Sequence, residues 1–115
     1  MTETPTKAAD IIRSLPQRFK KNEVDPGTQS VFHFDISGKN GGQFTVYVDE
    51  NECRVVDGLE GEAECMIKAQ DDVYEEVELG KRNAQMAVFM GKIKISNLPK
   101  MLQFINLFDR LYKRN

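Results

Sequence analysis

Several stretches of the chain alternate between apolar and polar residues. In residues 30–37, Phe32, Phe34 and Ile36 recur at every second position. Successive side chains of a strand point to opposite faces, so this period predicts a β-strand with one apolar side. The same alternation occurs in residues 43–49, 52–57, 62–70 and 92–96. We therefore expect a mainly antiparallel sheet with one covered face and one face toward solvent.

Helical spacing takes over outside these stretches. Residues 6–15 carry an amphipathic pattern that Pro16 should end or bend, because proline clashes with the carbonyl four residues earlier. Two short helices are predicted at residues 71–79 and 83–90, with Asn83 as the cap of the second. The chain thus changes from a sheet-forming part to a helix-forming part.

A last helix is predicted from Asn97 to Tyr112, with Pro99 in its first turn. Its apolar residues cover an arc of about 220° at 100° per residue. A helix lying on a sheet needs an apolar arc only somewhat wider than about 100°. A neighbouring helix, a dimer partner, a lipid surface or an internal ligand would each cover the surplus, and periodicity does not choose between them.

The composition adds the size and the charge. The chain has 115 residues and a net charge of −2, which fits one domain and gives no overall reason to expect nucleic-acid binding. Charge is nevertheless segregated, with net values of +1 for residues 1–48, −10 for 49–80 and +7 for 81–115. The basic last third would suit contact with an anionic membrane or headgroup. No apolar run is long enough to span a membrane and residues 1–10 lack the apolar centre of a secretion signal, so we expect a cytoplasmic protein.

Candidate catalytic and metal-binding residues are few. Cys53 and Cys65 are too far apart for a redox or zinc motif, and we expect both to pack in strands as small apolar groups. His33 is the single histidine, and we expect it to face solvent. The acidic residues at 71–78 have the spacing of an exposed helix face, and the glycine-rich segment 38–42 lacks a P-loop pattern. The residues therefore give no reason to expect an enzyme, a metal or another cofactor.

Several local strings, in this order, resemble the sterol carrier protein two family. They are SLPQRF at 14–19, VFHFDISG at 31–38, GGQFTV at 41–46 and, most specifically, GKRNAQMAVFMGKIKI at 80–95. The resemblance implies a single α+β domain over residues 1–115, in which helices cover one face of a five-stranded mixed sheet and leave an apolar tunnel. It also implies non-catalytic binding and transfer of a fatty acid, acyl-coenzyme A, phospholipid or sterol-like molecule.

This expectation gives a set of apolar residues that would surround the lipid. Unbranched methionines among them would let the lining repack around tails of different shape. The alternative is that the same side chains fill a solid core, and that the protein is an accessory or homodimerising module of the same fold. The set is Phe34, Phe44, Val46, Ile67, Val77, Met86, Phe89, Met90, Ile93, Ile95, Leu102, Ile105 and Phe108.

Overall fold

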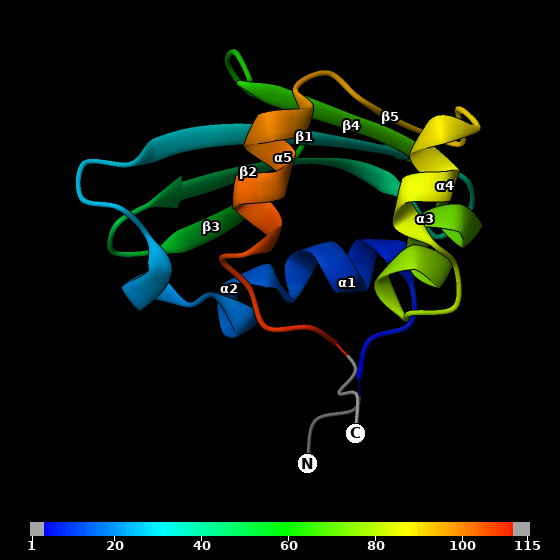
Figure 1. The fold of residues 1–115 in the computed structure, drawn as a ribbon, viewed down its shortest axis with the longest axis horizontal. Coiled ribbons are helices and arrows are strands. Elements are labelled where there is room, and N and C mark those ends of the chain that lie inside the picture. The colour runs from blue at the N-terminus through cyan, green and yellow to red at the C-terminus, as the bar shows by residue number, and fades with distance from the viewer. Residues whose placement is uncertain (1–3, 112–115) are drawn as a thin grey trace.

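The computed structural model describes residues 4–111, which fold as one sheet with helices (Figure 1). The strands are β1 (Gln29–Ser37), β2 (Gly42–Asp49), β3 (Cys53–Asp57), β4 (Cys65–Gln70) and β5 (Ile93–Ile95). The helices are α1 (Ala8–Arg13), α2 (Leu15–Arg18), α3 (Asp71–Glu78), α4 (Ala84–Phe89) and α5 (Leu98–Ile105), with a short 3₁₀ turn, η1, at Lys21–Glu23. The predicted α+β class and the five strands are confirmed.

The sheet is mixed, in the order β3-β2-β1-β4-β5. The central strand β1 pairs antiparallel with β2, where Phe34 lies opposite Phe44, and parallel with β4, where Phe34 lies opposite Ile67. β5 completes the other edge, with Ile95 opposite Ile67. Apolar residues of four strands therefore form continuous rows on one face of the sheet.

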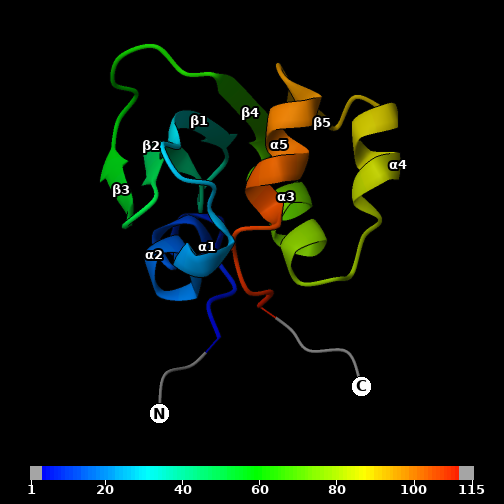
Figure 2. The same ribbon diagram turned by 60° about the vertical axis from the view of Figure 1, so that its left-hand side comes forward.

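The helices lie on that apolar face (Figures 1 and 2). Ile11 and Ile12 of α1 are fully buried against it, as are Val46 and Cys65 of the sheet. Burying one side chain of this size contributes roughly 1.5–3 kcal/mol. This single core accounts for the stability of a sheet whose other face is largely polar.

Pro16 acts as its position predicts. α1 ends at Arg13, and Pro16 stands in the first turn of α2, where its missing N–H is not needed. The side chain of Arg18 then donates hydrogen bonds to the backbone oxygens of Ile11 (3.1 Å) and Asp109 (3.0 Å). These hydrogen bonds connect α2 to α1 and to the segment that follows α5.

His33 does not face solvent, contrary to the sequence expectation. It is 6% exposed because residues 58–64, which connect β3 to β4, cross the outer face of the sheet above it. Its Nε2 lies 2.7 Å from the backbone oxygen of Glu60, so this nitrogen carries the proton and donates. Thr45 beneath the same loop donates to the Gly58 oxygen (2.7 Å) and accepts from the Glu60 amide (2.8 Å). Alternation along the strand does not reveal a covering loop.

The last helix is shorter than predicted. α5 ends at Ile105, residues 106–107 form a turn, and Phe108 then pairs with Phe19 as an isolated antiparallel bridge. The Lys20 amide also donates to the Leu107 oxygen at 2.7 Å. These backbone bonds to the segment after α2 replace the last helical turns, and Tyr112 lies outside the described residues.

Candidate functional site

The predicted lining residues separate into a buried and an exposed group. Fully buried are Phe34, Phe44, Val46, Ile67, Ile93 and Phe108, and half-buried are Val77 and Ile95. Exposed are Met86, Phe89, Met90, Leu102 and Ile105. The buried group belongs to the core between sheet and helices, whereas the exposed group lies on the outer sides of α4 and α5.

The core beneath α5 is built around aromatic rings. The Phe104 ring centroid lies 4.2 Å from that of Phe32, 4.7 Å from that of Phe108 and 5.9 Å from that of Phe34. Tilted rings at these distances attract each other beyond the area that they bury. This cluster holds α5 against β1 and gives the helix a fixed orientation.

The helix α4 is held to the sheet by few side chains. The Asn83 side chain caps it by accepting the Met86 amide (2.9 Å), and Ala87 is its one fully buried residue. Met86 is 55% exposed, Met90 63% and Phe89 86%. A phenylalanine with so little cover is unusual, because burying this ring is worth several times the thermal energy.

The helix α5 carries a second exposed apolar stripe. The Asn97 side chain caps its first turn by accepting the Lys100 amide (3.2 Å). Leu98, Leu102 and Ile105 follow at intervals of four and three residues, which places them on one side of the helix, beside the buried side of Phe104. They are 46%, 53% and 49% exposed.

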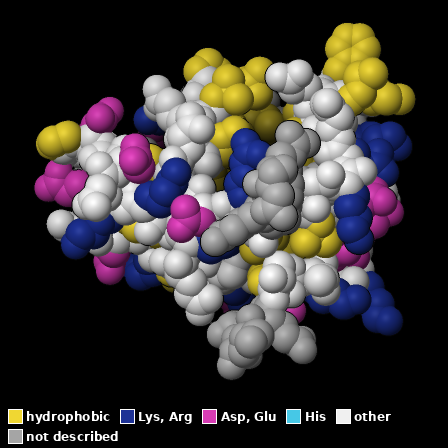
Figure 3. Space-filling view, turned by 60° about the horizontal axis from the view of Figure 1, so that its bottom comes forward, with side chains coloured by type: hydrophobic (Ala, Val, Ile, Leu, Met, Phe, Trp, Pro, Cys, Tyr) yellow, Lys and Arg dark blue, Asp and Glu magenta, His cyan; other side chains and the backbone are white. Residues whose placement is uncertain are grey.

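We call these two stripes together the α4–α5 apolar face: Met86, Phe89, Met90, Leu98, Leu102 and Ile105. Figure 3 shows apolar side chains gathered along the upper margin of that view, over α5 near the centre and at the α4 corner on the right. Both helices lie on the same side of the sheet (Figure 1). The face therefore consists of two exposed apolar patches, which the described part of the chain does not cover.

Two residues of this region were not among those predicted. Leu98 belongs to the exposed stripe, and its position four residues before Leu102 was the signal. Phe104 is the centre of the aromatic cluster, and its position four residues before Phe108 was the corresponding signal for the buried side. Neither residue was assigned to the lining set, because the wide apolar arc of a helix through Tyr112 does not distinguish a buried side from an exposed one.

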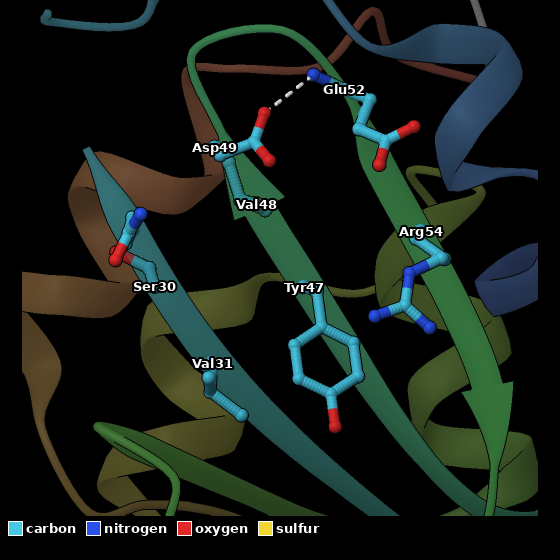
Figure 4. A pocket seen from close by; sticks show the side chains of 8 residues that line it. Ser30, Val31, Tyr47, Val48, Asp49, Glu52 and Arg54 are labelled. Atoms are coloured by element: carbon cyan, nitrogen blue, oxygen red, sulfur yellow. Dashed lines mark hydrogen bonds between the residues drawn. The ribbon is translucent and has the colours of Figure 1, made fainter. Parts of the chain in front are cut away.

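Two hollows lie on the opposite, outer face of the sheet. One, of about 340 Å³, is lined by Val31, Tyr47, Arg54 and polar residues at the ends of β1, β2 and β3 (Figure 4). The Arg54 guanidinium lies 4.4 Å from the Tyr47 ring centroid, and the Tyr47 hydroxyl donates to Glu60 at 2.6 Å, which raises the pKa of Tyr47. The mixed polar lining does not suit an apolar tail.

The second hollow, of about 360 Å³, lies beside β5. Its charged lining consists of Lys68, Lys92, Lys94 and Asp35. Lys68 of β4 lies directly opposite Lys94 of β5 in the sheet, and opposite Asp35 of β1 on its other side. This hollow is therefore an electropositive feature on the outer side of the same sheet edge that carries α4.

The cysteines pack as expected. Both thiols are free and buried, and burial raises the pKa of Cys53 to about 12 and also raises that of Cys65. Thiols of this kind are protonated at neutral pH and are poor nucleophiles. Among residues 4–111, no three or more His, Cys, Asp or Glu side chains are grouped as metal ligands would be.

Comparison with known proteins agrees with the fold. A family model described as the SCP-2 sterol transfer family matches residues 10–109. No sequence among curated proteins matches this chain. In the described part of the chain, every helix is too short or too polar to cross a bilayer.

Solved structures give the same fold in different settings. Sterol carrier protein 2 from Yarrowia lipolytica, in its apo form, is 28% identical over 64% of this chain and 67% of its own, with a TM-score of 0.50. Palmitated SCP2L2 from Aedes aegypti is 18% identical over 90% of this chain and 97% of its own, with a TM-score of 0.61. The sec-alkylsulfatase Pisa1 from Pseudomonas sp. is 15% identical over 93% of this chain, with a TM-score of 0.75, but the match covers only 17% of the sulfatase.

Proposed function

Because the chain belongs to the SCP-2 sterol transfer family, we propose that it binds and transfers apolar lipids without catalysing a reaction. The ligand class that we propose is a molecule with at least one long acyl or similarly apolar part: a fatty acid, an acyl-coenzyme A, a phospholipid or a sterol-like compound. A cytoplasmic location belongs to the same proposal.

The observation that carries the proposal is the α4–α5 apolar face. Its six large apolar side chains lie on or next to two helices on the same side of the sheet and remain exposed. Removing apolar surface from water gains about 25 cal/mol per Å², or about 0.8 kcal/mol for each methylene of a tail, less the cost of ordering the tail. Binding of an acyl chain would remove apolar surface of both the chain and the α4–α5 apolar face from water, and both would contribute to the free energy of binding.

Movement of α4 would extend the site into the protein. The helix packs on β5, where Ile93 is buried, and it contributes only Ala87 fully to the core. A tail that first contacts Met86 and Met90 would thus displace a weakly held element, and the unbranched methionines would adapt to its shape. In the bound state the buried and exposed members of the predicted set would then form one lining.

One structural relative gives this ligand class support. The Aedes aegypti SCP2L2 structure is that of a palmitated protein, and its fold matches 90% of this chain. A palmitoyl chain is an example of the long apolar tail that we propose.

A second function is favoured by the sulfatase comparison. Pisa1 contains this fold as a small part of an enzyme, so the same domain also occurs as an accessory module. In this alternative the α4–α5 apolar face would be covered by another subunit, by a second copy or by another domain, and not by a lipid. Light scattering separates the two, since a dimer without lipid uptake would support the module.

The test is a titration with a fluorescent fatty acid, followed by competition with an unlabelled one. The wild type should show saturable binding, and Leu102→Asn with Ile105→Asn should weaken it roughly tenfold, because the tail would lose apolar contacts. The matched control is Leu59→Asn, at an exposed leucine of the β3–β4 connection. The absence of saturable binding by the wild type, or equal effects of Leu59→Asn and the α5 variant, would contradict the proposal.

A further inference from the structure

The corner where α4 meets β5 combines a projecting apolar tip with the electropositive hollow. Phe89, at the end of α4, is 86% exposed, and Met90 after it is 63% exposed. Gly91, with φ +76°, reverses the chain so that β5 begins within two residues. Because of this abrupt turn, Phe89 and Met90 project at the edge of the sheet and not over its core.

Positive charge begins directly behind this tip. The hollow of about 360 Å³ includes Gly91 itself, together with Lys68, Lys92 and Lys94. Asp35 is the one carboxylate among its lining residues, and none of the three lysines forms an ion pair with another described residue. Three ammonium groups against one carboxylate leave a net positive charge at this edge.

The pairing of β4 with β5 brings two of these lysines together, and this lowers the stability of the sheet. Lys68 and Lys94 are directly opposite each other on β4 and β5, and like charges in that arrangement are destabilising. An anionic surface would relieve their repulsion. The same edge therefore offers apolar side chains that would leave water and cations that would be neutralised.

We propose that this corner, made by Phe89, Met90, Lys68, Lys92 and Lys94, is the surface by which the protein docks on an anionic lipid bilayer. Phe89 and Met90 enter the boundary between headgroups and acyl chains, while the lysines face the phosphates. Amphipathic surfaces bind such membranes by this combination of buried apolar area and electrostatic attraction. The proposal rests on the proposed lipid-carrier function, for which it supplies the place of loading and release.

The net charge of +7 in residues 81–115 suits contact with an anionic membrane but does not say which element makes it. In the α4–β5 corner, by contrast, the apolar and basic groups are adjacent. α4 is also the helix whose movement would open the lipid site, so that docking and opening involve the same element.

The experiment uses the absence of tryptophan from the chain. Phe89→Trp places a single fluorophore at the tip, and Leu59→Trp places one on the β3–β4 connection as a control. Each variant is mixed, without added fatty acid, with vesicles of phosphatidylcholine alone or of phosphatidylcholine with phosphatidylglycerol. We expect a blue shift for Trp at position 89 with the anionic vesicles, quenching by brominated acyl chains, and a smaller response at position 59.

The lysines are tested in the same Phe89→Trp background. Lys92→Gln with Lys94→Gln should weaken vesicle binding about fivefold for each lysine, whereas Lys7→Gln with Lys21→Gln should have little effect despite the same change in charge. Binding should also weaken as salt is added, because salt screens exposed charges.

Several results would overturn the docking surface. These are no blue shift with anionic vesicles, equal responses at positions 59 and 89, equal effects of the two lysine pairs, or the same shift with soluble polyphosphate. The outcome is separate from that of the fatty-acid titration, which contains no vesicles. Vesicle docking without fatty-acid uptake would leave this surface standing and contradict the carrier function, and the reverse result would contradict only the surface.

Discussion

The backbone of Phe19 pairs with that of Phe108, and the centroids of their rings lie 5.6 Å apart. This contact joins the segment after α2 to the segment after α5, residues that are far apart in the sequence. Phe108 also packs on Phe104, which anchors α5 on the sheet. The pair therefore fixes which side of α5 is buried and leaves Leu98, Leu102 and Ile105 facing outward.

Replacing Phe108 tests this role. Phe108→Ala should lower the free energy of unfolding by about 3–5 kcal/mol, the usual cost of removing a buried aromatic ring. Phe89→Ala is the matched control, and because Phe89 is 86% exposed the change should be within about 0.5 kcal/mol. Urea unfolding followed by circular dichroism measures both. Similar losses for the two variants would show that α5 is not anchored in this way.

Thr45 tests the loop that covers the outer face. Thr45→Val keeps the shape of the side chain but removes one hydrogen bond to Gly58 and one from Glu60. We expect a loss of about 1–3 kcal/mol, because buried polar groups would be left without partners. Thr28→Val removes a hydrogen bond in a more exposed turn and should cost less. Faster hydrogen exchange at the Glu60 amide would locate the loss in the loop, and unchanged exchange there would contradict the assignment.

The sheet could be predicted from sequence almost completely, because a period of two assigns each side chain to a face. Phe32, Phe34 and Ile36 are buried together as expected, and Asn83 caps α4 as expected. The bend at Pro16 was also predictable, since the restriction on proline is local. These features depend on residues that are neighbours in the sequence.

Other features depend on contacts between distant residues. The end of α5 at Ile105 is set by the pairing of Phe108 with Phe19, and the burial of His33 is set by Glu60. Helical periodicity continues through residue 108, so no local signal marks the end of the helix. For the same reason, periodicity alone does not divide the predicted lining set into buried and exposed members.

Glu78 gives a pH dependence with a definite sign. Burial raises its pKa from the ordinary value of 4.5, while Arg18 and a hydrogen bond from Tyr74 act in the opposite direction. The folded state therefore holds this proton more tightly than the unfolded state. The stability that comes from this proton is fully present below the unfolded pKa, and it is lost as the pH rises through the folded pKa.

Glu78→Gln should remove that part of the pH dependence. The variant should be at least as stable as the wild type at neutral pH, because burial disfavours the charged form of the native carboxylate and a neutral amide does not meet this cost. Its advantage should shrink as the pH falls through the raised pKa of the folded state, and it should be smallest and constant below the ordinary value for glutamate. Unfolding in urea across this pH range checks the sign, and an advantage for the variant that grows toward acidic pH would contradict the assignment.

The two cysteines provide a test of burial. With its pKa raised to about 12, Cys53 should react with a thiol reagent on the order of a thousandfold more slowly in the native protein than in urea at mildly alkaline pH. Cys65 should also be protected, because burial raises its pKa as well. Fast labelling of both thiols in the native state would show that the strands open readily.

The most direct test of the lipid site uses the methionine methyl groups as probes. Met86 and Met90 belong to the α4–α5 apolar face. Met66 of β4 is paired in register with His33 of β1, and both side chains lie on the outer face of the sheet. With ¹³C-labelled methionine methyl groups, titration with a long-chain fatty acid below its micelle concentration should shift the Met86 and Met90 signals in a saturable manner and leave Met66 nearly unchanged. Signals that do not move, or that move equally at Met66, would contradict a lipid site at this face.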